Sequence, residues 1–188
     1  EDSFDILSAN AFGMDRPPDD PASPDVLNFR RAELLREIMV QAGDADKPIW
    51  FAEYGWNAAP ADAEEVLWRR VSEPTQAAWT VDGVELAETS WPWAGVFNIW
   101  YFRQWGGLAP DRAVYYFRMV DVDWTPRRLY QAVQAAMQER DVAGPGYWAE
   151  RSAPVALPTD LAQRDLWSWT WADGATDRNA LSSREPGA

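Results

Sequence analysis

Glu53 is the residue of this sequence with the clearest chemical potential, because it ends the apolar segment KPIWFAEYGW (residues 47–56). A glutamate in this position is either a catalytic carboxylate or a solvated, salt-bridged strand end. The chain contains no histidine and no cysteine. This composition excludes Ser-His-Asp and Cys-His catalysis, histidine or thiolate metal sites, and disulfides. Any chemistry must therefore rest on carboxylates, hydroxyls, amides and aromatic rings.

Three apolar segments are predicted strands, at residues 4–10, at 48–53 and within 91–102. Because side chains alternate along a strand, Ile49, Phe51 and Glu53 are expected on one face, which would line a barrel interior. The same rule groups residues at the ends of the other two strands: Ile6, Ser8 and Asn10 with Phe12 just beyond, and Val96, Asn98 and Trp100. We therefore expect three strand-end residues to face a polar ligand: Asn10, Glu53 and Trp100.

Helical spacing separates these strands. Apolar residues recur at helical intervals over residues 27–42, and a second helix is expected over 73–90, although Gly83 weakens its middle. A third helix is expected to begin with Thr125 as N-cap and Pro126 in the first position. Strand and helix thus alternate three times, an order that predicts parallel strands in an α/β fold. The strands are almost continuously apolar, as expected when both sheet faces are covered.

Three such units are the repeat of a (β/α)₈ barrel, but they cannot close one, and an open sheet of this kind leaves two bare edges. The chain begins at Glu1 rather than methionine, so we expect it to be an internal piece of a longer protein. Residues 143–188 differ in composition: they are rich in proline and glycine and then alternate aromatic with polar residues. This composition predicts a linker and the start of a β-rich or partly disordered region. Within this region, LWSWTW is expected to form one half-buried strand.

Charge and hydropathy exclude some partners. The net charge of −13 argues against nucleic acid and anionic membrane surfaces, and no apolar run is long enough to span a bilayer. The chain has 13 tryptophans, which fit either a well-filled core or a sugar-binding cleft; composition does not separate these. An acidic chain without cysteine fits an extracellular or cell-surface bacterial enzyme, and it also fits a cytoplasmic one.

The segment KPIWFAEYGWN resembles the seventh strand of clan A retaining glycoside hydrolases, a group of (β/α)₈ TIM-barrel enzymes that includes cellulases and β-xylosidases. The segments FDILSANAFG and SWPWAGVFNIWYFRQWG look like the sixth and eighth strands, and VDVDWTPRRLYQAV is similar to the closing loop and last helix. The resemblance implies that residues 1–142 are the C-terminal part of such a barrel. It also implies that Glu53 is the nucleophile and that Trp100 lines the subsite of the cleaved sugar. Further substrate contacts are expected from Asn10, Phe12 and Trp56.

Two departures from the family pattern bear on this interpretation. Asn10 and Phe12 stand where the family tends to have histidine and tyrosine, so a hydroxyl that would hold the nucleophile is missing. The family's acid/base glutamate belongs to an Asn-Glu pair, and this chain contains no such dipeptide. Other carboxylates, such as Asp15, Asp111 and Asp121, lack the strand context that would place them opposite Glu53.

The resulting expectation is a fragment of a retaining glycoside hydrolase that cleaves β-glycosidic bonds in a β-glycoside or polysaccharide without any cofactor. Its acid/base residue would lie in the missing N-terminal part of its own barrel, and the isolated fragment would be inactive. Two alternatives stay open. One is a non-catalytic carbohydrate-binding or scaffold protein with a degenerate barrel, and the other is a complete α/β domain of unrelated function.

Overall fold

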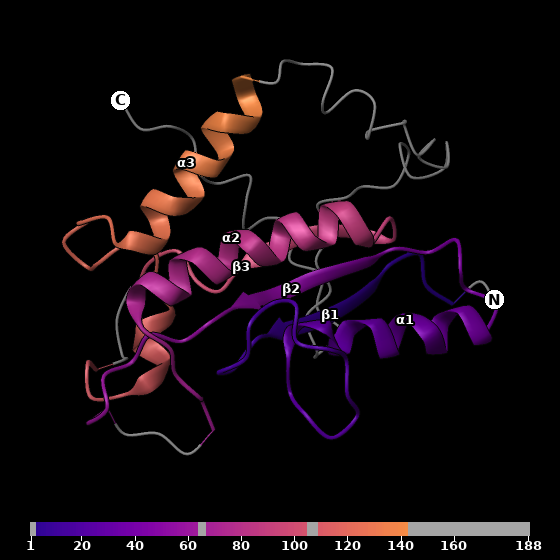
Figure 1. Cartoon of the computed structure of the whole chain (residues 1–188), viewed down its shortest axis with the longest axis horizontal. Helices are drawn as coiled ribbons and strands as arrows, with labels where there is room; N and C mark the ends of the chain where they lie inside the picture. The colour runs from indigo at the N-terminus through magenta and orange to yellow at the C-terminus, as the bar shows by residue number, and fades with distance from the viewer. Residues whose placement is uncertain (1–2, 64–66, 105–108, 143–188) are drawn as a thin grey trace, which may run out of the picture. The chain divides into compact units, whose positions relative to one another are not determined.

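The computed structural model describes residues 3–63, 67–104 and 109–142. Strands and helices alternate through this part of the chain, as predicted (Figure 1). In order, they are β1 (Leu7–Phe12), α1 (Ala32–Gln41), β2 (Ile49–Gly55), α2 (Glu73–Ser90), β3 (Ala94–Ile99) and α3 (Arg128–Val142). Two short 3-10 helices, η1 (Phe29–Arg31) and η2 (Ala113–Phe117), precede α1 and α3. The predictions for 143–188, including the LWSWTW strand, lie outside the described residues.

The three strands form one parallel sheet in the order β1-β2-β3, which places β2 in the centre (Figure 1). The predicted α/β class and the parallel pairing are therefore confirmed. β1 and β3 are the edges of the sheet as far as the structure describes it. β1, which carries Asn10, and β3, which Trp100 follows, thus flank the strand that carries Glu53.

One face of this sheet is covered by helices. A single apolar cluster joins that face to residues of η1, α1 and α2. Its buried members are Ala9, Ala11, Phe29, Ala32, Met39, Ile49, Phe51, Tyr54, Trp56, Ala87 and Trp91. Aromatic stacking dominates it, for example between Phe51 and Phe97 with ring centroids 4.4 Å apart.

The opposite face, here called the open face, is exposed. It carries Ser8, Asn10, Trp50, Ala52, Val96 and Asn98, all of them exposed, together with the half-exposed Glu53. Trp50 is 42% exposed and Val96 39% exposed, although both are large apolar residues in a sheet. The expectation that both sheet faces are covered is therefore not met by the part of the chain that the structure describes.

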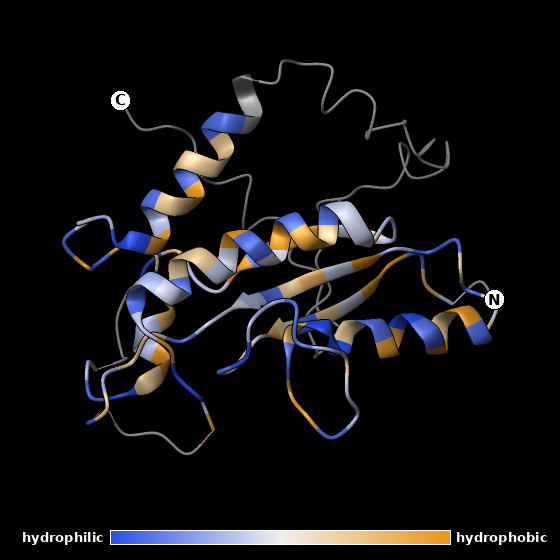
Figure 2. Cartoon of the chain, viewed as in Figure 1, coloured by the Kyte–Doolittle hydropathy of each residue, from blue (hydrophilic) through white to orange (hydrophobic). Residues whose placement is uncertain are grey.

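Helix α1, like the open face, exposes large apolar side chains. It buries Ala32 and Met39, whereas Ile38 is 62% exposed and Val40 49% exposed. Figure 2 shows hydrophobic and hydrophilic residues alternating along α1 on its visible side. Of the residues 27–42 predicted as helical, 32–41 form α1 and 29–31 form η1, and only part of the apolar side of α1 is buried.

Helix α2 begins as its sequence predicts and continues through its glycine. Ser72 is the N-cap, accepting a hydrogen bond from the Thr75 amide at 3.2 Å, and Pro74 lies in the first turn. Gly83 is buried against the side chain of Tyr54, which reaches α2 from β2. A Cβ atom at this position would lie 2.4 Å from the Tyr54 hydroxyl oxygen. The glycine is thus required by packing against the sheet.

The predicted start of the third helix is wrong. Helix α3 begins at Arg128, and the predicted first residue, Pro126, instead forms an antiparallel bridge with Val120. The Thr125 amide donates to Asp123 Oδ1 at 3.0 Å, so residues 121–125 form a turn before the helix. The bridge between Pro126 and Val120 therefore prevents the helix from starting at Thr125 and Pro126, although these residue types favour a helix start.

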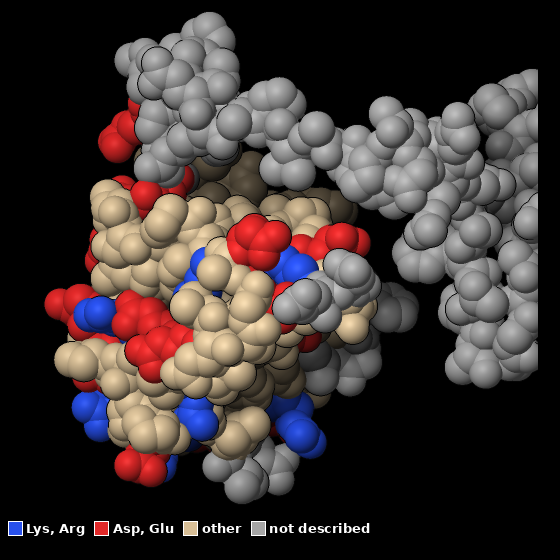
Figure 3. Space-filling view, turned by 90° about the vertical axis from the view of Figure 1, so that its right-hand side faces the viewer, with Lys and Arg blue, Asp and Glu red and all other residues tan. Residues whose placement is uncertain are grey.

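Acidic and basic side chains are interspersed on the face of the molecule shown in Figure 3. No helix among the described residues has the length and apolar character needed to cross a bilayer.

We predict that Gly83→Ala destabilises the fold, even though alanine favours a helix over glycine by about 1 kcal/mol. The added methyl group would collide with Tyr54, and overpacking of this kind costs about 1–3 kcal/mol. Urea denaturation followed by circular dichroism measures the effect. Ala78→Gly, at an exposed position of α2, gives the cost of glycine where no packing is involved.

The collision itself is tested by a double-mutant cycle. Tyr54→Phe removes the hydroxyl, so Gly83→Ala should cost less in that background, by about 0.5 kcal/mol or more. An equal cost in both backgrounds would show that the close approach to Tyr54 is not the cause.

Candidate functional site

The candidate site lies at the carboxyl end of the sheet on its open face. The open face changes character along the strands. Near the amino ends its large side chain is Trp50, whose ring covers Gly95 so closely that a Cβ there would lie 2.5 Å from the ring. Near the carboxyl ends it carries Asn10, Glu53 and Asn98, one polar residue from each strand. Polar groups thus gather where ligands bind in parallel α/β folds.

Glu53 reaches the open face through a bulge in β2. Against β1, the register passes from Ala9↔Phe51 to Asn10↔Glu53, so β2 advances two residues while β1 advances one. Against β3, it passes from Phe51↔Phe97 to Tyr54↔Ile99, so β2 advances three residues while β3 advances two. Both neighbours therefore indicate one extra residue in β2 just after Phe51.

This bulge overturns the predicted alternation. Ile49 and Phe51 were expected to share the interior face with Glu53, but both are 0% exposed in the helix-covered core. Tyr54 is 0% exposed in the same cluster, although strict alternation would put it opposite Phe51. The extra residue resets the alternation, so Glu53 is directed to the open face for a different reason from the one predicted.

Asn10 holds the Glu53 carboxylate. Its side-chain amide Nδ2 donates a hydrogen bond to Glu53 Oε2 at 3.0 Å, across the β1–β2 pairing. No described residue is recorded as a donor to the other oxygen, Oε1. One carboxylate oxygen of Glu53 is therefore held by the protein. The two site residues predicted for these strands are thus brought together.

Phe12 does not take the role of the missing tyrosine. Its half-buried ring packs edge-on against Trp68, with centroids 4.7 Å apart, and against Phe117 at 5.4 Å. The ring thus belongs to an aromatic cluster beyond the end of β1. The only polar restraint recorded on the Glu53 carboxylate in the described residues comes from Asn10.

Trp56 was predicted to contact substrate, and the structure places it in the core instead. It is 1% exposed, packs against Tyr54 and Phe29, and donates from Nε1 to the Arg16 carbonyl at 2.8 Å. A Cβ atom on Gly13 would lie 1.9 Å from its ring, so the ring is enclosed. The expected substrate contact from Trp56 is therefore wrong.

Tyr54, the next residue after Glu53, is also structural. Its hydroxyl donates to the Thr80 carbonyl in α2, and burial raises its pKa well above the ordinary value. Tyr54 and Trp56, on either side of Gly55, thus anchor the end of β2 to the core. Glu53 is the only carboxylate in β2.

Trp100 lies next to the end of β2. Its amide donates to the Tyr54 carbonyl at 2.8 Å, its side chain is half-buried, and the Trp100–Tyr101 peptide bond is cis. The indole contacts the Tyr101 ring edge-on at 5.5 Å. Trp100 and Glu53 therefore come from neighbouring strand ends.

Asn98 was not among the predicted site residues. It shares the exposed side of β3 with Val96, and its Nδ2 donates to the Phe51 carbonyl at 3.1 Å. Alternation grouped it with Val96, which is likewise exposed, but a bond to a bulged backbone cannot be recognised in a sequence.

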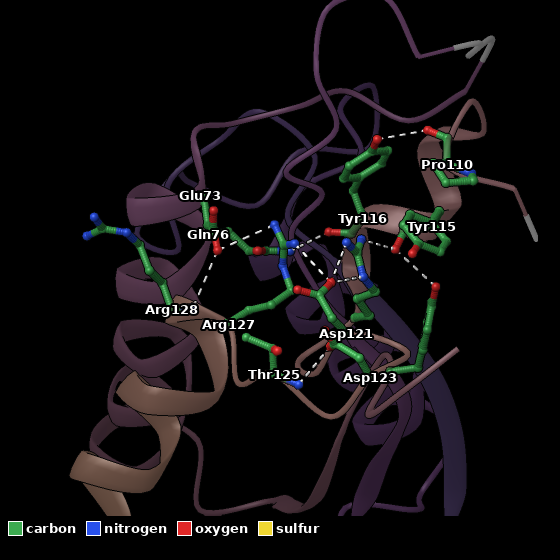
Figure 4. A network of polar contacts seen from close by, with 12 residues as sticks. Glu73, Gln76, Pro110, Tyr115, Tyr116, Asp121, Asp123, Thr125, Arg127 and Arg128 are labelled. Carbon is green, nitrogen blue, oxygen red and sulfur yellow. Dashed lines mark hydrogen bonds and ion pairs between the residues drawn. The ribbon is translucent and has the colours of Figure 1, made fainter. Parts of the chain in front are cut away.

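Asp121, one of the other carboxylates considered from the sequence, is committed to a structural network. It accepts hydrogen bonds from Arg118 Nε at 2.7 Å and from Arg127 Nη1 at 3.3 Å (Figure 4). Arg127 also pairs with Glu73 at the start of α2, at 3.4 Å. This network ties the first turn of α2 to the residues before α3.

The remaining candidates offer no second carboxylate to Glu53. Asp15 lies 3.9 Å from Arg16 with its side chain 54% exposed, and Asp111 is exposed. No hydrogen bond or ion pair joins Asp15, Asp111 or Asp121 to Glu53 in the described ranges. Those ranges also hold no group of three acidic side chains able to bind a metal ion.

Comparisons with known proteins agree with this geometry at the level of the fold. No family model matches the chain, and neither does any curated protein. A family 39 glycoside hydrolase from the gut symbiont Bacteroides cellulosilyticus WH2 aligns with a TM-score of 0.50 and 19% identity, over 71% of this chain and 27% of its own. Further solved structures align with lower TM-scores, among them the following two.

These two are a GH2 β-galacturonidase from Eisenbergiella tayi and a β-glucuronidase from Faecalibacterium prausnitzii. The first has a TM-score of 0.48 and 21% identity, over 72% of this chain and 24% of its own. The second has a TM-score of 0.46 and 15% identity, over 72% and 22%. The chain thus spans about a quarter of the length of the solved structures it matches. The likeness to the family 39 enzyme shows that the described α/β unit has a glycoside hydrolase-like fold.

Proposed function

We propose that this chain is part of a retaining glycoside hydrolase and that Glu53 is its nucleophile. The observation that carries the proposal is the position of Glu53. It is half-exposed at the carboxyl end of the central parallel strand, with Oε2 held by Asn10 at 3.0 Å. Catalytic groups occupy this end of the strands in (β/α)₈ enzymes.

The arrangement suits a double displacement. Glu53 Oε1 attacks the anomeric carbon and forms a covalent glycosyl-enzyme while the bond to the leaving oxygen breaks. A second carboxylic acid protonates that oxygen, and as a carboxylate it then takes a proton from the water that releases the sugar. The hydrogen bond from Asn10 keeps Oε2 in place, so the attacking oxygen is directed with little loss of rotational freedom.

The substrate class we propose is a β-glycoside or polysaccharide. Trp100, beside the end of β2, supplies an aromatic surface on which the apolar face of a sugar ring can stack. Asn10 has a second amide N–H available for a sugar hydroxyl while the first binds Glu53. No cofactor enters this mechanism, because two carboxyl groups suffice for it.

The second carboxylate, in this proposal, belongs to residues that complete a (β/α)₈ barrel outside this chain. Two surfaces support it. β1 and β3 have unpaired edges within the described sheet, and a groove beside β1 is lined by exposed apolar residues, among them Leu27, Leu35 and Ile38. Unpaired edges beside exposed apolar surface are what removal of neighbouring βα units would leave.

The nucleophile assignment predicts that Glu53→Gln abolishes turnover in the longer protein that contains this chain. The amide is nearly isosteric, but it cannot attack the anomeric carbon, so kcat with an aryl β-glycoside should fall by a factor of about 1,000 or more. Glu85→Gln, at an exposed position of α2, is the matched control and should behave as wild type.

A second variant separates lost chemistry from lost folding. Glu53→Ala leaves room for a small anion, so added azide should restore turnover and give a glycosyl azide with inverted configuration. Full activity in Glu53→Gln would contradict the proposal.

The proposed division of the site predicts that the isolated chain of 188 residues does not hydrolyse glycosides. It should also associate through its bare edges, so its apparent mass by light scattering should rise with concentration. A monomeric chain that turns over an aryl β-glycoside would refute the placement of the second carboxylate outside it.

A second candidate function is non-catalytic carbohydrate binding on a degenerate barrel. The observation in its favour is that Phe12 packs into an aromatic cluster and presents no hydroxyl to Glu53. The sequence preceding this chain distinguishes the two functions. An Asn-Glu pair ending a strand about three βα units before β2 favours catalysis, and another residue in place of that glutamate favours binding alone.

A further inference from the structure

The bulge in β2 needs a restraint, because an extra residue interrupts the regular hydrogen bonds of a strand. The bulge falls immediately after Phe51 in the central strand, and the register against β3 also shifts just before Phe51. Such a segment can relax toward regular pairing, and a one-residue slip would send the following side chain to the other face of the sheet. For Glu53, the other face is the helix-covered core.

Asn98 supplies a bond at this point. Its side chain lies on the open face of β3, and its Nδ2 donates to the Phe51 carbonyl at 3.1 Å. That carbonyl belongs to the residue at which the register of β2 changes against both neighbours. A side chain of the neighbouring strand thus bonds the backbone where the ladder is irregular.

Glu53 is therefore held from two sides. Asn10, from β1, bonds its carboxylate directly, and Asn98, from β3, bonds the backbone two residues before it. The first contact fixes an oxygen atom, and the second fixes the turn of the main chain that brings the carboxylate to the open face.

We propose that Asn98 is a positioning residue for Glu53: it locks the β2 bulge through the Phe51 carbonyl and thereby aims the carboxylate at the ligand. This inference rests on the proposed function, since aim matters only if Glu53 reacts. Because Asn98 acts through the backbone of β2, we expect its loss to misplace the reacting carboxylate and lower kcat. The affinity for substrate should change little.

The test uses Asn98→Leu in the longer protein, because leucine matches asparagine in size and cannot donate a hydrogen bond. The kcat with an aryl β-glycoside should fall about 10- to 100-fold, the order expected when a reacting group is displaced by about 1 Å. The KM should change by less than about threefold, because interactions made only in the transition state lower kcat. Val96→Ala, two residues earlier on the same side of β3, should leave both constants unchanged.

Asn98→Gln provides the rescue arm. It keeps an amide donor on a longer side chain, so it should recover most of the activity that Asn98→Leu loses. A raised KM with unchanged kcat in Asn98→Leu would overturn the inference, because it would make Asn98 a substrate contact. Unchanged constants in an otherwise active enzyme would overturn it as well.

Amide hydrogen exchange gives a readout that does not depend on activity. In Asn98→Leu, a peptide covering residues 51–55 should exchange at least about tenfold faster than in Val96→Ala, since the bulge loses its bond. Equal exchange in the two variants would show that Asn98 does not lock the bulge. If the wild-type protein hydrolyses no glycoside, the proposed function fails, and the exchange comparison still decides the role of Asn98.

Discussion

The structure around Glu53 depends on one constraint, the extra residue that β2 contains just after Phe51. Without it, alternation would direct either Phe51 or Tyr54 away from the helix-covered core, and both are fully buried there. With it, the strand keeps both aromatic anchors on the covered side and still presents Glu53 on the open face. The same strand thus supplies both buried core residues and the exposed carboxylate of the candidate site.

Packing on the covered side explains why this arrangement is rigid. Phe51 stacks on Phe97, and Tyr54 packs against Phe29 and bonds the Thr80 carbonyl in α2. Gly83 allows α2 to approach closely enough for that bond. A carboxylate between two such anchors loses little freedom when a ligand binds, and this is the condition for a well-aimed nucleophile.

Much of the fold and part of the site could be predicted from the sequence. Periodicity predicts the strand–helix order and the helical face of α1. The parallel order of the strands places the strand ends with Asn10, Glu53 and Trp100 at the same edge of the sheet. The face assigned to Ile49 and Phe51 was wrong, because a bulge is set by pairing with both neighbours and leaves no mark on a single strand. Trp56 was misassigned for a similar reason. Its burial depends on Gly13 and Phe29, which lie far from it in the sequence. The start of α3 shifted because Pro126 pairs with Val120.

In the proposed mechanism, a carboxylate oxygen of Glu53 forms the covalent bond of the glycosyl-enzyme. The most direct measurement treats the longer protein with a 2-deoxy-2-fluoro β-glycoside that bears a good leaving group, then maps the modified peptide by mass spectrometry. If Glu53 is the nucleophile, we expect one sugar per molecule, attached to Glu53 through an ester bond. Attachment to another carboxylate, in a protein that is inactivated by the reagent, would contradict it.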